Sequence, residues 1–140
     1  MAKTNELLLD TCAAIWLSLQ ARMTAEAVTA IDEASDQGLP LRLSLITAWE
    51  LGLLEKSGRA PMTQSPHAMF QAFLRMPGIQ AQQLTPDILI ESSLLPGELH
   101  GDPADRIIIA TARTLDLTVV TRDRHILDYA TQGHVRALLC

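Results

Sequence analysis

Short apolar segments alternate along this sequence with segments that carry helix start and stop signals, and this alternation limits the fold more than any other feature. The clearest apolar segments cover residues 6–10, 41–45 and 117–121. Strands that alternate with helices of about ten residues predict a parallel sheet covered by helices on both faces. The expected fold class is therefore α/β.

Hydrophobic periodicity and turn signals divide the whole chain into such elements. We expect strands at residues 6–10, 41–45, 79–84, 117–121 and 135–139, and helices at 11–17, 24–37, 48–57, 67–75, 86–94, 103–115 and from 124 onward. The stretch 59–66 is the most loop-like. Because no repeat, low-complexity tract or linker interrupts this pattern, we expect one domain over residues 1–140.

Composition limits the class of protein. Hydrophobic residues make up 48% of the chain and charged residues 19%, which is sufficient for a packed core and argues against disorder. No apolar run approaches the roughly 20 residues of a membrane helix, and the N-terminus is a poor secretory signal. Cys12 and Cys140 are too few for a disulfide framework, and we expect Cys12 to lie in apolar surroundings. We therefore expect two free thiols and a cytoplasmic location.

The net charge of −5 argues against a protein that coats nucleic acid by charge alone. It leaves open an enzyme that acts on nucleic acid, because acids that bind cations contribute to that charge. Phosphate contacts would then be local and made by arginine. The candidates are Arg106, Arg122 and Arg124, although solvent-exposed arginines without such a role are common.

Four carboxylates stand at the ends of predicted elements, and they are called the four acids below: Asp10, Glu50, Asp105 and Asp123. Asp10 and Asp123 follow strands, whereas Glu50 and Asp105 each fall in the first turn of a predicted helix. Each has a structural interpretation. Asp10 and Asp123 would be helix N-caps, and Glu50 would complete a capping box that begins at Thr47.

The segment from His100 to Ala112 contains two acids three positions apart. Asp102 precedes Pro103, as expected of an N-cap followed by proline at the first helical position. Asp105 would be the third residue of this helix, where a carboxylate gains from the helix dipole.

When the four acids are considered together, a shared binding site explains their positions better than four separate structural roles do. A parallel sheet brings the ends of its strands to one edge, where sites form at the point at which the strand order reverses. Carboxylates gathered there repel unless a cation lies among them. Oxygen ligands suit Mg²⁺ or Mn²⁺. Zinc is disfavoured because the histidines, at 67, 100, 125 and 134, lack ligand spacing.

Four blocks of the sequence, at residues 7–16, 46–51, 100–112 and 120–123, resemble in order the signature blocks of PIN-domain nucleases. The likeness is greatest to the VapC-type toxins of bacterial toxin–antitoxin pairs. It implies a three-layer α/β/α PIN-like domain with a central parallel sheet. It also implies that the four acids are catalytic and bind the metal, with Thr121, Asp102 and Thr47 in support. Cys12 departs from the pattern, since relatives more often have histidine or asparagine there.

The resemblance implies an endoribonuclease that depends on Mg²⁺ or Mn²⁺ and that functions as the toxin of a type II toxin–antitoxin system. Implied partners are the RNA substrate, a cognate VapB-type antitoxin that places a basic side chain in the acidic pocket, and a second copy in a homodimer. Two alternatives remain. One is a catalytically inactive PIN-like scaffold that binds a partner or RNA. The other is an aspartate-based phosphatase, which would need an acid at the position of Cys12 and a suitably placed lysine.

Overall fold

The structure is a computed structural model that describes residues 6–58, 63–99 and 101–140. Its strands are β1 (Leu7–Leu9), β2 (Leu41–Ser44), β3 (Ile79–Gln82), β4 (Thr118–Thr121) and β5 (Arg136–Leu139). Its helices are α1 (Thr11–Ser18), α2 (Ala25–Asp36), α3 (Ile46–Ser57), α4 (Pro66–Arg75), α5 (Pro86–Ser93), α6 (Pro103–Leu115) and α7 (Arg124–Thr131). No helix of the described residues is long and apolar enough to cross a membrane.

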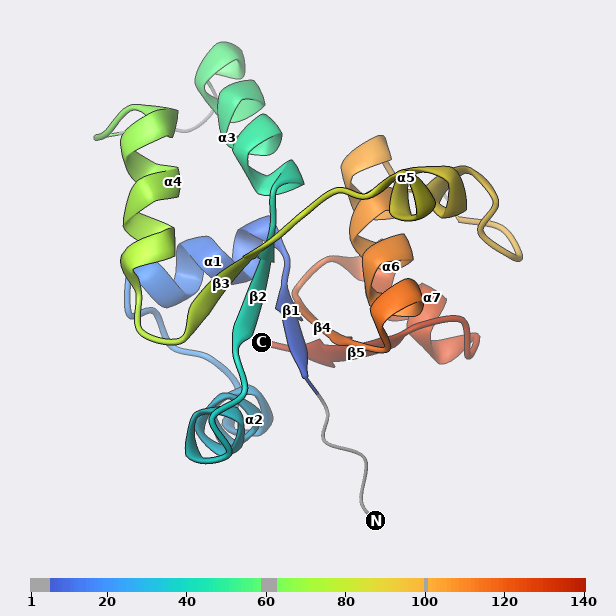
Figure 1. The fold of residues 1–140 in the computed structure, drawn as a ribbon, viewed down its shortest axis with the longest axis horizontal. Helices are drawn as coiled ribbons and strands as arrows, with labels where there is room; N and C mark the ends of the chain where they lie inside the picture. Colours follow the sequence, from blue (N-terminus) through green and yellow to red (C-terminus); the bar gives the residue numbers. More distant parts are fainter. Residues whose placement is uncertain (1–5, 59–62, 100) are drawn as a thin grey trace.

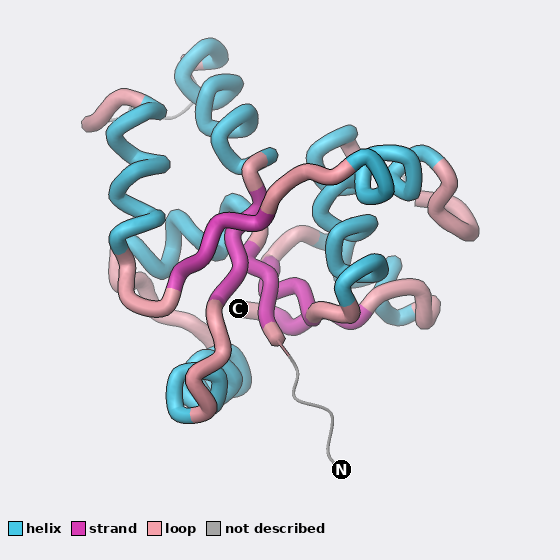
Figure 2. The backbone as a smooth tube through the Cα atoms, viewed as in Figure 1, coloured by secondary structure: helices cyan, strands magenta, loops and turns pink. Residues whose placement is uncertain are grey.

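The five strands form one parallel sheet in the order β3-β2-β1-β4-β5. The chain runs outward from β1 to β3 and then crosses to the other side of β1 to form β4 and β5, as the tube in Figure 2 shows. The strand order therefore reverses between β1 and β4. In parallel α/β sheets, sites form beyond the carboxyl ends of the strands at such a point.

The central strand β1 is buried on both faces, which explains its uninterrupted leucines. Leu7 and Leu9 pack into a cluster with residues of α1, α2 and α4, whereas Leu8 packs into a second cluster with residues of α6 and α7. Figure 1 shows α1 and α4 on one side of the sheet and α6 and α7 on the other. The predicted three-layer α/β/α arrangement is confirmed.

All the predicted strands and helices are present, and their ends differ from the prediction by at most two residues. The helix predicted at 103–115 has those bounds in the structure. The glutamines of the strand predicted at 79–84 are explained by the position of β3, which is an edge strand whose residues are only partly buried or exposed. Of the predicted loop 59–66, residues 59–62 lie outside the described residues, and Pro66 is the first residue of α4.

Helix α3 begins two residues earlier than predicted. Leu45 is its N-cap residue in a helical conformation, and no side chain caps the helix in the usual way. Instead the Ser44 hydroxyl at the end of β2 accepts a hydrogen bond of 3.1 Å from the Ile46 N–H. Thr47 is therefore inside the helix, and the predicted capping box from Thr47 to Glu50 is wrong. Glu50 accordingly lies in the second turn of α3 and not in the first.

The central strand gives a test of the fold. Leu8 is fully buried between the sheet and the helices α6 and α7, so Leu8→Ala should lower the free energy of unfolding by about 2–5 kcal/mol. Leu19, which is 68% exposed, is the matched control, and Leu19→Ala should change it by less than about 0.5 kcal/mol. Urea denaturation measures both. Equal effects of the two substitutions would contradict this assignment of the core.

Candidate active site

Two of the four acids follow the strands on either side of the reversal in strand order. Asp10 follows β1, and Asp123 lies two residues after β4. Leu9 pairs with Val120 in the sheet, and the Asp10 N–H continues the ladder with a hydrogen bond of 3.2 Å to the Val120 carbonyl. The sheet itself therefore brings Asp10 next to Thr121 and close to Asp123.

Hydrogen bonds fix the Asp10 carboxylate. Its Oδ1 accepts the Ala13 N–H at 2.7 Å, which confirms the predicted N-cap, and its Oδ2 accepts the Thr121 hydroxyl. The Thr121 Oγ1 in turn accepts the Asp123 N–H at 2.9 Å. Thr121 thus joins Asp10 to the backbone of Asp123. Asp123 also caps its helix as predicted, because its Oδ1 accepts the Ile126 N–H at 3.1 Å.

Glu50 is brought to the same edge by α3. Its Oε1 accepts the Thr11 hydroxyl at 2.5 Å, and the Thr11 Oγ1 lies 2.9 Å from the Thr47 Oγ1. The expected role of Thr47 as a helix cap is replaced by this contact between α1 and α3. The sequence analysis did not single out Thr11. Its position directly after Asp10 was visible, but its bonding partner lies 39 residues along the chain.

The two acids at the start of α6 have different roles. The Asp102 carboxylate accepts the Asp105 N–H at 2.9 Å, so Asp102 is the predicted N-cap. Gly101 packs closely on Asp105, because a Cβ at Gly101 would lie 3.1 Å from the Asp105 Cβ. The cap and the glycine together restrict where the Asp105 side chain can lie. His100 lies outside the described residues.

The electrostatic environment shows that the four acids share one region. Burial, followed by repulsion from Asp123, Asp102 and Glu50, raises the pKa of Asp105 to about 7. Burial is also the main cause that raises the pKa of Asp10 to about 6 and that raises the pKa of Glu50, and repulsion among the acids adds to both. Without a cation, burial and repulsion therefore make the ionised form of these carboxyls less stable than it is in water.

Cys12 lies beside the same acids. The residue is exposed, so the expected apolar surroundings are wrong, whereas Cys140 is buried. Partial burial of the thiol, followed by repulsion from the four acids, raises the pKa of Cys12 to about 11. Such a thiol stays protonated near neutral pH and is a poor nucleophile. The expectation that both cysteines are free thiols is confirmed.

The donor set fits a hard divalent cation. Carboxylate oxygens that repel one another are ligands for Mg²⁺ or Mn²⁺, and the nearby thiol is protonated. Across the described ranges, no three His, Cys, Asp or Glu side chains form a group ready to hold a metal ion. Mg²⁺ does not require such a group, because it is commonly bound through one or two carboxylates and keeps several waters.

The three candidate arginines differ in their contacts. The Arg106 guanidinium donates to the Ser92 carbonyl at 3.0 Å and holds the end of α5. The Arg122 guanidinium donates to the carbonyls of Cys140 and Arg22 and lies 4.3 Å from the Trp16 ring centroid. Arg124 is exposed and has no hydrogen bond or ion pair to any described residue. Among the three, its guanidinium is the one left available for a ligand.

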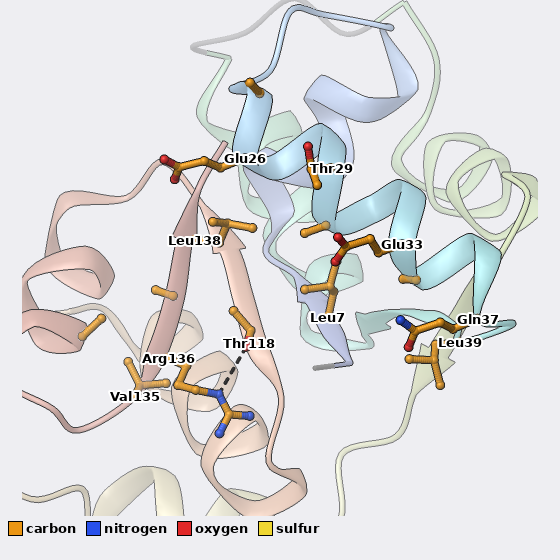
Figure 3. A pocket seen from close by; sticks show the side chains of 15 residues that line it. Leu7, Glu26, Thr29, Glu33, Gln37, Leu39, Thr118, Val135, Arg136 and Leu138 are labelled. Carbon is orange, nitrogen blue, oxygen red and sulfur yellow. Dashed lines mark hydrogen bonds between the residues drawn. The ribbon is translucent and has the colours of Figure 1, made fainter. Parts of the chain in front are cut away.

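A groove of about 960 Å³ lies between α2 and the sheet, along β5 and at the first residues of β1 and β4 (Figure 3). Leu7 and Leu138 are part of its apolar lining, and Glu26 and Glu33 project from α2 beside it. None of the four acids lines this groove. The groove is therefore separate from the region of the four acids.

A comparison with models of known protein families identifies the family of this chain. The model of the PIN domain matches residues 7–132. The chain belongs to the PIN-domain family. This membership confirms the resemblance expected from the four sequence blocks. It also contradicts the aspartate-based phosphatase alternative, and Cys12 occupies the position where such a phosphatase needs its second acid.

PIN-domain relatives were found by sequence and by structure. The chain is 29% identical over 119 residues to Ribonuclease VapC22 of Mycobacterium tuberculosis, covering 85% of this chain and 88% of the relative. The fold is similar to that of VapBC2 from Rickettsia felis, solved bound to a promoter DNA fragment, with a TM-score of 0.67, 12% identity and coverage of 96% and 98%. It is also similar to M. tuberculosis VapC20, a sarcin–ricin loop cleaving toxin, with a TM-score of 0.55, 18% identity and coverage of 93% and 97%.

The raised pKa of Asp10 predicts how the stability of this PIN domain depends on pH. Folded Asp10 binds its proton more tightly than the unfolded chain does, with a pKa of about 6 against 3.8. Its contribution to stability is therefore complete below pH 4 and is lost as the pH rises through 6. In metal-free buffer, the free energy of unfolding of Asp10→Asn relative to the wild type should therefore rise by up to about 3 kcal/mol between pH 4 and pH 8.

Urea denaturation at a series of pH values measures this difference. Asn keeps the oxygen that caps α1 but puts an amide nitrogen where Asp10 accepts the Thr121 hydroxyl, and this second effect does not change between pH 4 and 8. Asp32→Asn on the exposed face of α2 is the control, because it removes one carboxylate outside the group of four acids. If the difference in free energy of unfolding between Asp10→Asn and the wild type stayed constant from pH 4 to 8, burial and repulsion would not raise the pKa of Asp10.

Proposed function

We propose that this chain is a metal-dependent endoribonuclease that acts as the toxin of a type II toxin–antitoxin system. The observation that carries the proposal is that four carboxylates from distant parts of the chain lie at one edge of the sheet in a PIN-family protein, each in repulsion with at least one other. The name of the relative VapC22 describes a ribonuclease, which supports the activity. We further propose that residues 1–140 act as a single nuclease domain.

The four acids would hold one or two Mg²⁺ or Mn²⁺ ions, with Asp102 close by. A bound ion of this kind supplies Lewis-acid chemistry, since it lowers the pKa of a coordinated water and offsets charge on the phosphodiester. The protein contributes the placement of the carboxylates. Asp10 is held by Thr121 and by the Ala13 N–H, and Asp105 is held by its position in the first turn of α6.

Protonation of the acids should control activity. Carboxylates must lose their protons to act as ligands, and the pKa of metal-free Asp105 is about 7. Cation binding and RNA cleavage should therefore both increase as the pH rises through this value. No serine or cysteine nucleophile is needed, because the attacking group in this proposal is water.

Contacts to the RNA backbone would come from the surface around the acids. Arg124 follows Asp123, and its guanidinium is available to a phosphate. Arg106 and Arg122 are used by backbone carbonyls, so their first role in the proposal is to hold α5 and the C-terminus in place. An arginine beside an acidic cation site would guide the phosphodiester toward it.

The proposed partners follow from the charge of the site and from the relatives. Structural neighbours include complexes of VapB with VapC, in some cases bound to DNA. We propose that a cognate VapB-type antitoxin covers the acids with a basic side chain, which the negative potential of the region would attract. We also propose a homodimer, by analogy with the family.

The activity is tested by incubating the purified chain with total RNA and Mn²⁺ and mapping the cleavage sites. Cleavage should require the metal, stop with a chelator and increase from pH 6 to 8. Asp105→Asn should lower the rate about 100-fold or more, because it removes a carboxylate needed for the metal and the attacking water.

Asp32→Asn, prepared in the same way, is the control, since Asp32 lies on the exposed face of α2. It should cut at the wild-type rate and at the same sites. Cleavage by Asp105→Asn at the wild-type rate would rule out the site. A wild-type chain that binds Mn²⁺ but cuts no RNA would favour the inactive scaffold.

A further inference from the structure

The hydroxyl of Thr11 connects helices α1 and α3 and contacts one of the four acids, Glu50. Thr11 is the first residue of α1, directly after Asp10, and only 5% of it is exposed. Its Oγ1 lies 2.5 Å from the Glu50 Oε1 and 2.9 Å from the Thr47 Oγ1, and Thr47 is fully buried. None of the sequence motifs assigned a role to this contact.

The directions of these hydrogen bonds follow from counting protons. A threonine hydroxyl has one proton to donate and lone pairs to accept. An ionised Glu50 carboxylate can only accept, so the Thr11 proton must go to Glu50. The bond between the two threonines then needs its proton from Thr47. The result is a directed chain from Thr47 through Thr11 to Glu50, in which each bond polarises the next.

This chain restrains the longest side chain among the four acids. Glutamate has three rotatable side-chain bonds, whereas Asp10 and Asp105 have two each and are held close to helix starts. Glu50 lies in the second turn of α3, so no helix cap restrains it. The hydroxyl that does restrain it belongs to the residue next to Asp10, whose own carboxylate is bonded to Thr121. The positions of Glu50 and Asp10 are therefore coupled.

We propose that Thr11 is a positioning residue that fixes the Glu50 carboxylate relative to Asp10, with one carboxylate oxygen committed to the hydroxyl and the other left for a ligand. The inference rests on the proposed function for its purpose, but the restraint can be measured without metal. A purely structural role for Thr11, limited to satisfying buried hydroxyls, would leave Glu50 free to change rotamer without loss of cation binding.

The first measurement uses the metal-free protein. NMR side-chain couplings of Glu50 should report a single rotamer in the wild type and in Thr11→Ser, which keeps the hydroxyl. Rotamer averaging should occur in Thr11→Val, which keeps the shape but removes the hydroxyl. Thr11→Ala is a second variant in case valine perturbs α1. Thr111→Val is the matched control, because Thr111 is also a buried helical threonine but bonds the Ile107 carbonyl.

The second measurement is Mn²⁺ affinity, by calorimetry or electron paramagnetic resonance. Removing a group that orients a metal ligand commonly costs 10–100-fold in affinity. Thr11→Val and Thr11→Ala should therefore bind Mn²⁺ about 10-fold or more weakly, while Thr11→Ser and Thr111→Val should bind like the wild type. In a Glu50→Ala background, Thr11→Val should cause no further loss, because the two residues act as one unit.

The outcomes separate the two proposals. A single Glu50 rotamer in both Thr11→Val and Thr11→Ala overturns the positioning role, as does an equal loss of Mn²⁺ affinity with and without Glu50. If the wild type binds no Mn²⁺ and cuts no RNA, the proposed function fails. The Glu50 couplings then still decide whether Thr11 fixes this carboxylate.

Discussion

Repulsion between carboxylates is the constraint on which the functional end of this molecule depends. Asp10, Glu50 and Asp105 are all removed from water to a large extent, and each is repelled by at least one other acid of the group. Such an arrangement persists only if the backbone and its hydrogen bonds hold the groups in place. The parallel sheet does this by ending β1 and β4 side by side, and helices α3 and α6 bring the remaining acids to the same edge.

The helix caps and the proposed cation site use the same side chains. Asp10, Asp102 and Asp123 all accept N–H groups at the starts of helices, so their structural interpretations are correct. A cap occupies one carboxylate oxygen, and each oxygen has more than one lone pair. Capping therefore fixes the rotamer of an aspartate without using up its capacity as a ligand. The two interpretations of these residues are complementary, and neither excludes the other.

Much of the fold could be predicted because the relevant signals are local. The bounds of α6 follow from Asp102 and Pro103, and the leucines of β1 indicate a strand buried on both faces. The start of α3 could not be predicted in this way. Its first turn is stabilised from outside the expected motif by the hydroxyl of Ser44, so a sequence that matches a capping box adopts another structure.

The site could likewise be predicted only where its signals are local in the sequence. The sequence by itself determined the α/β class, the family and which acids stand at the ends of elements. Hydrophobic periodicity, helix caps and motif blocks are all patterns of residues that lie close together in the sequence. Only the tertiary structure decided that Thr11 bonds Glu50, that Thr121 joins Asp10 to Asp123, and that Arg122 is used by the C-terminus. These contacts join residues that the sheet order brings together across distant parts of the chain. Their geometry depends on the packing of whole helices, which no local pattern records.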